Sequence, residues 1–165
     1  MKTHIKKDVS ADELFPLIRE VIHHGHKARF TISGSSMCPW ILDNRDQVLI
    51  AGSSVLKPGD IILYQNRHGN YILHRIMKKE ANGFRTMGDS CTTLDEELIA
   101  PKDVIGVVQK IYRNGKEIDC TSAFWQFVFY LWRVLLPVRK ELLQLYHTMS
   151  RIRYETEKRR NGLGA

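Results

Sequence analysis

Six short segments with β-strand character follow one another between residues 28 and 112, and they constrain the fold more than any other feature. Each is rich in β-branched, aromatic or other apolar residues. Turn residues separate them, including Asn-Gly pairs at 82–83 and 114–115 that favour tight hairpins. The segments are 28–33, 47–52, 60–65, 71–77, 84–88 and 104–112. This pattern predicts a mainly β domain over residues 28–120.

Residues 10–24 are predicted to form a helix that precedes the β domain. Ser10 and Glu13 make an S-x-x-E capping box at its start. Gly25 follows its end, where glycine commonly terminates helices. Apolar residues recur at helical spacing at Leu14, Leu17, Ile18, Val21 and Ile22. Pro16 lies inside the pattern and is expected to shift the start of the helix or to kink its first turns.

A densely apolar and aromatic run begins at Ser122, and a basic, amphipathic stretch follows it. The run, residues 122–138, is at the lower limit of length for a transmembrane helix, and Arg133 lies inside it. Residues 133–160 hold eight Arg or Lys and three Glu, so they carry +5 of the chain's net charge of +7. We expect residues 121–165 to form a helical tail that docks on a membrane surface or a partner. The alternative is a helix packed on the β domain or on a second copy.

The chain of 165 residues has room for one domain and an appendage, here residues 1–27 and 121–165 around the β domain. Its net charge of +7 points to an anionic partner: a membrane surface, a nucleic acid or an acidic peptide. The aromatic residues of the tail cluster apart from its basic residues, whereas a stacking surface for nucleic acid would interleave them. Lipid or protein, including a second copy, is therefore the expected partner, and nucleic acid is not.

Cysteine and histidine usage argues against disulfides and metals. Cys38, Cys91 and Cys120 form no C-x-x-C pair and are odd in number, which is typical of a reducing compartment. The histidines within residues 23–26 have no second cluster at zinc-ligand spacing, so we expect them on the surface at a helix end and predict no metal or cofactor. The first 14 residues are basic without a following apolar run. We therefore expect neither a secretory signal nor an N-terminal anchor, and a location in the cytoplasm or at the periphery of a membrane.

The segment Thr31–Trp40 contains serines placed for nucleophilic chemistry. A serine hydroxyl needs an adjacent base and a tight turn whose backbone N–H groups stabilise an oxyanion. The Gly-Ser-Ser sequence at 34–36, after a predicted strand, suits that geometry. By itself the motif is more often a plain hairpin turn with a buried methionine.

A histidine and two aspartates further along supply the other parts needed for base-assisted acyl transfer. His74 lies in an alternating β pattern, Asp89 lies in a Gly-Asp turn, and Asp95 follows six residues later. Taken singly, His74 also fits a half-buried strand histidine, and Asp89 fits a turn cap. Considered together with the serine turn, their order along the chain favours a functional role over these separate explanations.

In order and type, these residues resemble the serine peptidases that include signal peptidases and the LexA-like self-cleaving repressors. The resemblance covers residues 28–113. The family's G-x-S-M-x-P pattern matches residues 34–39, which makes Ser36, directly before Met37, the implied nucleophile in place of Ser35. The resemblance also implies the β fold of that family.

The base distinguishes the branches of this family. Bacterial-type signal peptidases and LexA-like proteins have a lysine there, whereas the endoplasmic-reticulum and archaeal type has a histidine in a His-Arg pair. Here the pair is His74-Arg75, followed by Gly88-Asp89 and Asp95, so the chain looks like a small bacterial member of the histidine type. The matching boxes also contribute residues with structural roles: Met37, Pro39, Gly59, Asp60, Arg75 and Gly88.

The resemblance implies a catalytic role for each polar residue. His74 accepts the proton of the Ser36 hydroxyl as the acyl-enzyme forms and returns it to the leaving amine. Either Asp95 or Asp89 orients the imidazole, and both alternatives are open at this stage.

The same resemblance places the oxyanion site at residues 34–36. The backbone N–H of Ser36 is the expected donor. Some members add a hydroxyl two residues before the nucleophile. Gly34 stands there in this chain, so Ser33 or Ser35 would have to substitute.

The function expected from these residues is a serine endopeptidase that cleaves a specific precursor or leader peptide, at a membrane surface or in the cytoplasm. One alternative is a non-catalytic binding or scaffold module with the same fold. A LexA-like DNA-binding regulator that cleaves itself is less favoured. The segment before the β domain is too short for a helix-turn-helix module, and His74 stands where such regulators have a lysine.

Overall fold

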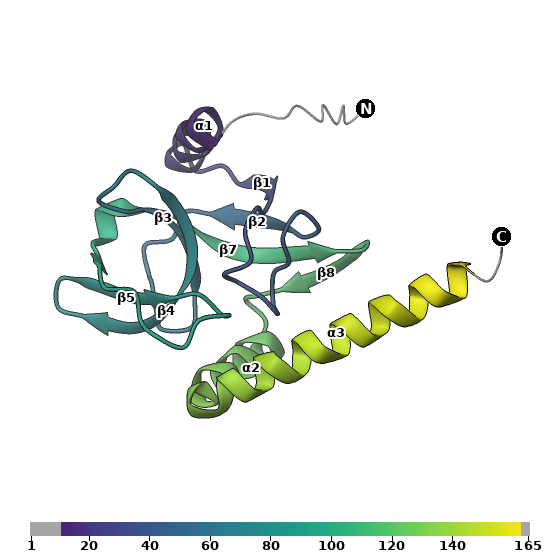
Figure 1. Ribbon diagram of the computed structural model, residues 1–165. Helices are drawn as coiled ribbons and strands as arrows, with labels where there is room; N and C mark the ends of the chain where they lie inside the picture. Colours follow the sequence, from purple (N-terminus) through teal and green to yellow (C-terminus); the bar gives the residue numbers. More distant parts are fainter. Residues whose placement is uncertain (1–10, 163–165) are drawn as a thin grey trace, which may run out of the picture.

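An antiparallel β-sheet forms the body of the molecule in the computed structural model, which describes residues 11–162 (Figure 1). Within these residues, strands pair in the order β1-β2-β7-β3-β4-β5-β6, and β8 pairs with β7. The strands are β1 (Ala28–Thr31), β2 (Gln47–Ala51), β3 (Ile61–Gln65), β4 (Tyr71–Glu80), β5 (Gly83–Met87), β6 (Leu98–Ile99), β7 (Val104–Arg113) and β8 (Lys116–Asp119). Every predicted β segment contains a strand, so the mainly β fold is confirmed.

The sequence did not predict strands β6 and β8, because both are short and β8 is also mostly polar. The Asn-Gly pair at 114–115 forms the predicted hairpin between β7 and β8, with both residues at positive φ. At the other Asn-Gly pair, residues 82–83, the turn lies one residue earlier than predicted. Gly83 already belongs to β5 and pairs with Glu80, so residues 81 and 82 form the turn. Gly83 is required there because the Ile99 carbonyl of β6 occupies the place of a Cβ.

The central strand β3 separates two hydrophobic clusters. Its residues 61–64 are all buried, and successive side chains point to opposite faces. Ile61 and Leu63 join the cluster that includes Met37, whereas Ile62 and Tyr64 join the second cluster. Burial on both faces explains why this strand is a continuous apolar run instead of an alternating one.

Helix α1 (Ala11–His23) matches the predicted helix closely. Ile18 and Ile22 are buried against the first cluster. Gly25, at φ +79°, ends the helix and its N–H donates to the carbonyl of Ile22. Pro16 lies within the helix without ending it. Ser10 of the predicted capping box lies outside the described residues.

The C-terminal segment folds into α2 (Ala123–Val134), the short 3₁₀ turn η2 (Leu136–Val138) and α3 (Arg139–Gly162). One face of α2 packs on the β domain, where Phe129 and Trp132 surround Trp40 with ring centroids 5.7 Å away. For this face the less favoured alternative, packing on the domain, is therefore correct. Figure 1 shows α3 continuing well past the sheet. Among the described residues, no helix combines the length and apolarity needed to cross a membrane.

Candidate active site

The turn that carries Ser36 lies in the connection from β1 to β2. Gly34 adopts φ +110°, a conformation that favours glycine, and its N–H donates to Asp43 Oδ1 (2.8 Å). Met37 is 1 % exposed and fixes the turn to the first hydrophobic cluster. The Cys38 N–H donates to the carbonyl of Ser35 (3.1 Å) and closes the turn. The small residues and the buried methionine together leave Ser36 only partly covered.

His74 lies on β4 and is held by one carboxylate. Its Nδ1 is 2.7 Å from Oδ2 of Asp95, and the two side chains are 12 % and 26 % exposed. Antiparallel pairing with β3 places His74 opposite Ile62. The structure thus selects Asp95, and not Asp89, as the residue that contacts the imidazole.

Two hydroxyls hold Asp95 in place. Thr86 donates from Oγ1 to Asp95 Oδ2 (2.6 Å), and the Tyr64 hydroxyl donates to the same oxygen (3.3 Å). Burial raises the pKa of Asp95, but the hydrogen bonds from His74 and Thr86 outweigh it, so the pKa lies below its usual value. Asp95 is therefore ionised at neutral pH. Burial also raises the pKa of Tyr64, which remains a protonated donor.

Gly88 brings the histidine and the serine turn together. A Cβ at this position would lie 3.2 Å from His74 Nε2 and 2.7 Å from the carbonyl oxygen of Ser36. The backbones therefore approach at a distance that only glycine permits. Ser90 completes the junction, because its N–H (2.9 Å) and its hydroxyl (3.0 Å) both donate to the Ser36 carbonyl.

Ser36 and His74 line one open cavity of about 240 Å³. Its walls are residues 32–34, 36 and 37, on the segment after β1, and residues 71–74 of β4. Among the described residues, no hydrogen bond joins Ser36 Oγ to His74 Nε2. Such bonds are often long in a free enzyme and tighten when substrate binds.

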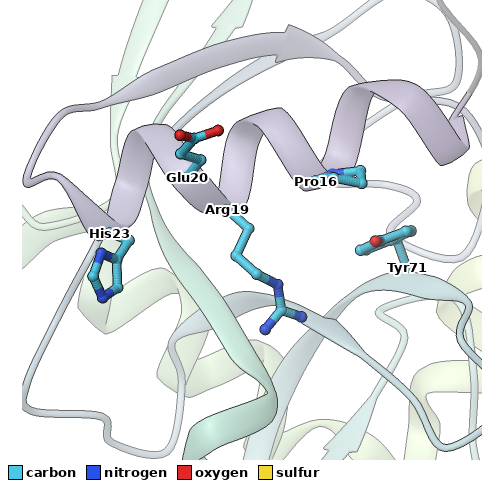
Figure 2. Close-up of a pocket in the computed structure, with 5 residues that line it drawn as sticks. All are labelled: Pro16, Arg19, Glu20, His23 and Tyr71. Carbon is cyan, nitrogen blue, oxygen red and sulfur yellow. The ribbon is translucent and has the colours of Figure 1, made fainter.

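A larger cavity, of about 460 Å³, adjoins the first one at Tyr71. Figure 2 shows Tyr71 beneath Pro16 of α1, with the Arg19 side chain extending from the same helix. Arg19 donates to Gln65 (3.1 Å). No candidate catalytic residue lines this larger cavity, so the smaller one is the candidate active site despite its size.

Backbone donors are available beside Ser36. Within the described part of the chain, the N–H groups of Ser35, Ser36 and Met37 donate to no acceptor, whereas Gly34 donates to Asp43. The predicted oxyanion turn therefore keeps free donors at Ser35 and Ser36, while Gly34 serves only the backbone geometry.

Asp89 has a structural partner in place of the histidine. Arg75 donates to both Asp89 oxygens (2.8 and 2.7 Å), and both side chains are fully buried. Arg75 also donates to the carbonyl of Gly59 (2.7 Å), which ties the Gly59-Asp60 turn to the same pair. Burial raises the pKa of Asp60, whose carboxylate accepts from the Lys57 N–H. A buried bidentate pair of this kind fixes the positions of the segments it joins.

A second buried carboxylate supports the serine turn, and sequence reasoning missed it. Asp46 is completely buried and accepts hydrogen bonds from Leu42, Arg45 and Arg113. Arg113 also donates to the carbonyl of Trp40 (2.6 Å). Thr86, Tyr64 and Ser90 were missed as well. The sequence around these residues carries no motif that points to the site. They lie on β3, on β5 and in the loop after β5, and only strand pairing brings them close to Ser36 and His74.

Arg139, at the start of α3, reaches the loop that carries Asp95. It is fully buried, and it donates to the carbonyls of Trp132 (2.8 Å) and Cys91 (3.3 Å). Burial lowers its pKa, and nearby Asp89 partly offsets that effect. The tail is therefore attached directly to residues 88–95.

Two of the three cysteines are poor competitors for the role of nucleophile. All three are free thiols, and two of them, Cys38 and Cys120, are buried. Burial raises the pKa of Cys120 to about 12 and also raises that of Cys38. Within residues 11–162 no group of His, Cys, Asp or Glu is arranged to hold a metal. The histidines within residues 23–26 are exposed at the end of α1, as predicted.

No protein-family model matches the chain, and no curated protein matches it in a sequence comparison. Hydrogen bonds nevertheless connect the four segments that carry the family resemblance, which are residues 34–39, 59–60, 74–75 and 88–95. Arg75 links the turn at 59–60 to Asp89, Asp95 contacts His74, and Ser90 donates to Ser36. Residues separated by more than 50 positions thus meet at one site.

Proposed function

We propose that this chain is a serine endopeptidase in which Ser36 is the nucleophile, His74 the general base and Asp95 the residue that orients the base. The observation that carries the proposal is the placement of His74. Its Nδ1 is held by Asp95, while its Nε2 and the Ser36 carbonyl oxygen both lie beside Gly88. Ser36 and His74 also share one cavity that is open to solvent.

The state of Asp95 determines which nitrogen of His74 can act as a base. An ionised carboxylate only accepts hydrogen bonds, so Nδ1 must carry the proton that it donates to Asp95. The neutral imidazole then has an unprotonated Nε2. That nitrogen is the one that lies beside Gly88, where the Ser36 carbonyl oxygen also approaches.

The chemistry follows from this arrangement. Ser36 Oγ attacks the peptide carbonyl while His74 Nε2 takes its proton, and the negative charge on the carbonyl oxygen is stabilised by N–H groups of the turn. The C–N bond breaks as His74 returns the proton to the leaving amine. Water, activated by the same nitrogen, then hydrolyses the acyl-enzyme and releases Ser36.

The substrate class proposed is a specific precursor or leader peptide, in keeping with the resemblance to signal peptidases. The β-fold of that family is part of the same proposal. An open cavity between the Ser36 turn and strand β4 suits a flexible peptide better than a folded surface.

Labelling with a fluorophosphonate, which phosphonylates activated serines with loss of fluoride, tests the proposal directly. We expect the purified full-length chain to be labelled at Ser36, and Ser36→Ala to abolish labelling. Ser35→Ala removes the neighbouring hydroxyl and Cys91→Ser removes the thiol near Gly88, and both variants should keep the label. Mass spectrometry of the labelled peptide identifies the site.

Two outcomes would contradict the proposal. A chain that is folded but takes no label supports the non-catalytic alternative, in which the same fold serves as a binding module. Labelling that persists in Ser36→Ala would assign the nucleophile elsewhere.

A further inference from the structure

The outward side of α2 is an uninterrupted apolar surface. All of its exposed residues are apolar or aromatic, and we call those from position 124 onward the α2 apolar face. Its members are Phe124, Phe127, Tyr130, Leu131 and Val134, which are 42–67 % exposed. Leu135 and Val138 extend it into the turn before α3, at 39 % and 46 % exposure. Contiguous apolar surfaces of this kind mark interaction sites in soluble proteins.

The single charged residue of α2 does not interrupt this surface. Arg133 turns toward the β domain, where it donates to the carbonyl of Met77 (3.1 Å). Phe129 and Trp132 occupy the inward side against Trp40. Packing on the β domain therefore does not explain why the outward side of α2 is apolar.

The next helix continues the pattern with added positive charge. Leu145, Met149 and Ile152 are each more than half exposed and follow one another at four- and three-residue spacing on α3. Residues 140–160 contain six Arg or Lys and three Glu. An apolar face with a basic flank is the usual composition of a helix that lies on an anionic bilayer.

Charge favours an anionic membrane over a second copy of the chain as the partner of this surface. A second copy would bring two basic tails together, and their like charges repel. Anionic lipid head groups instead attract each nearby Lys or Arg, by about 1 kcal/mol. Tyr130 brings an amphipathic ring of the kind favoured at the boundary between acyl chains and head groups. Phe124 and Phe127 bring apolar rings of the kind that interfacial helices bury in lipid.

We propose that the α2 apolar face inserts into the head-group region of a membrane that contains anionic lipids, with the exposed basic residues Lys140 and Arg151 of α3 toward the head groups. The helices lie in the plane of the bilayer and do not cross it. This inference is independent of the chemistry proposed for Ser36.

Sedimentation with lipid vesicles tests this proposal on the full-length chain. We expect the chain to partition into mixed phosphatidylcholine–phosphatidylglycerol vesicles, and more weakly into phosphatidylcholine vesicles. Added salt should weaken binding to the mixed vesicles by screening the attraction. Replacing both Phe124 and Phe127 by serine should lower the partition coefficient at least about tenfold, because two exposed rings no longer enter the lipid.

Matched controls separate a specific surface from general stickiness. Leu17→Ser removes an exposed apolar residue of α1, itself 57 % exposed, and should leave binding unchanged. Lys140→Glu should weaken binding to mixed vesicles. Lys27→Glu makes the same change in net charge at an exposed residue between α1 and β1, outside the C-terminal helices, and should have a smaller effect. Both phenylalanines are exposed, so their replacement should not unfold the chain.

Each outcome decides the question. No partition into mixed vesicles, or equal partition by the double serine variant, overturns the proposal. A concentration-dependent dimer that is lost in Phe127→Ser, without vesicle binding, would show that a second copy covers the α2 apolar face.

Discussion

His74 and Arg75 are neighbours on β4 but make different contacts. His74 and Arg75 point to opposite faces of the strand, because side chains alternate in a β-strand. His74 meets Asp95 at the edge of the open cavity, and Arg75 meets Asp89 in the buried interior. The two aspartates therefore differ in their contacts: Asp95 holds the proposed base, and Asp89 holds the buried framework behind it.

Replacing Asp95 by asparagine should slow the phosphonylation of Ser36 by the fluorophosphonate about a hundredfold or more. Asparagine keeps the size of the side chain, but without the negative charge it no longer stabilises the imidazolium that forms on His74. The measurement is the rate of label incorporation, followed by intact-mass spectrometry. Glu96→Gln, which makes the same carboxylate-to-amide change at the exposed neighbouring residue, should label at the parent rate. Equal rates for both variants would remove Asp95 from the mechanism.

At the scale of elements, α2 serves two environments at once. Its inward aromatic side chains complete the core around Trp40, and its outward side is the α2 apolar face. Arg139 then links the following helix to the loop of residues 88–95. Docking of the tail and the position of the Asp95 loop are mechanically connected through this contact.

Two phenylalanines of α2 offer a matched test of how the helix docks. Phe129→Ala should cost about 3–5 kcal/mol of the free energy of unfolding, because Phe129 is 2 % exposed and its removal leaves a cavity. Phe127→Ala should change it by less than about 0.5 kcal/mol, because that ring is 59 % exposed. Urea unfolding followed by circular dichroism measures both. Similar costs for the two would mean that α2 does not pack on the domain in this orientation.

At the scale of the whole molecule, buried carboxylates couple stability to pH. Burial raises the pKa of Asp46, but hydrogen bonds from Arg45 and Arg113 outweigh it, so the pKa is lower in the folded chain than in the unfolded one. Asp95 shows the same direction. A lowered pKa contributes stability above the unfolded value of about 3.9. That contribution is lost as pH falls through the folded value.

Comparing Asp46→Asn with the parent chain tests this linkage. The variant should be less stable than the parent by about 2 kcal/mol at pH 7, because the charged acceptor is lost. The difference should narrow at about pH 3, because Asp46 of the unfolded parent chain, with a pKa of about 3.9, is then mostly protonated and the folded carboxylate contributes less stability. Asp103→Asn, at a residue without a side-chain hydrogen bond among the described residues, should track the parent at both values. A difference that does not depend on pH would rule out the charge of Asp46 as its cause.

The positions of the strands were predictable because their signals are local. Turn residues such as Asn114 and Gly115 and the apolar pattern of each segment act over a few neighbours, so they hold in any tertiary setting. The same is true of α1 and its end at Gly25. The strands β6 and β8 were missed because their pairing depends on the neighbouring strand and not on their own composition.

The sequence alone determined which residue types follow one another in the chain: a serine turn, a His-Arg pair, a Gly-Asp turn and a later aspartate. Only the tertiary structure decided which of them meet. The register of β3, β4 and β5 places Asp95 against His74 and Asp89 against Arg75, and it recruits Thr86 and Tyr64 from other strands. The packing of α2 likewise depended on the site around Trp40, because a helix that is apolar on every side does not specify its inward face. Contacts between distant residues depend on strand register and side-chain direction, which no local pattern encodes.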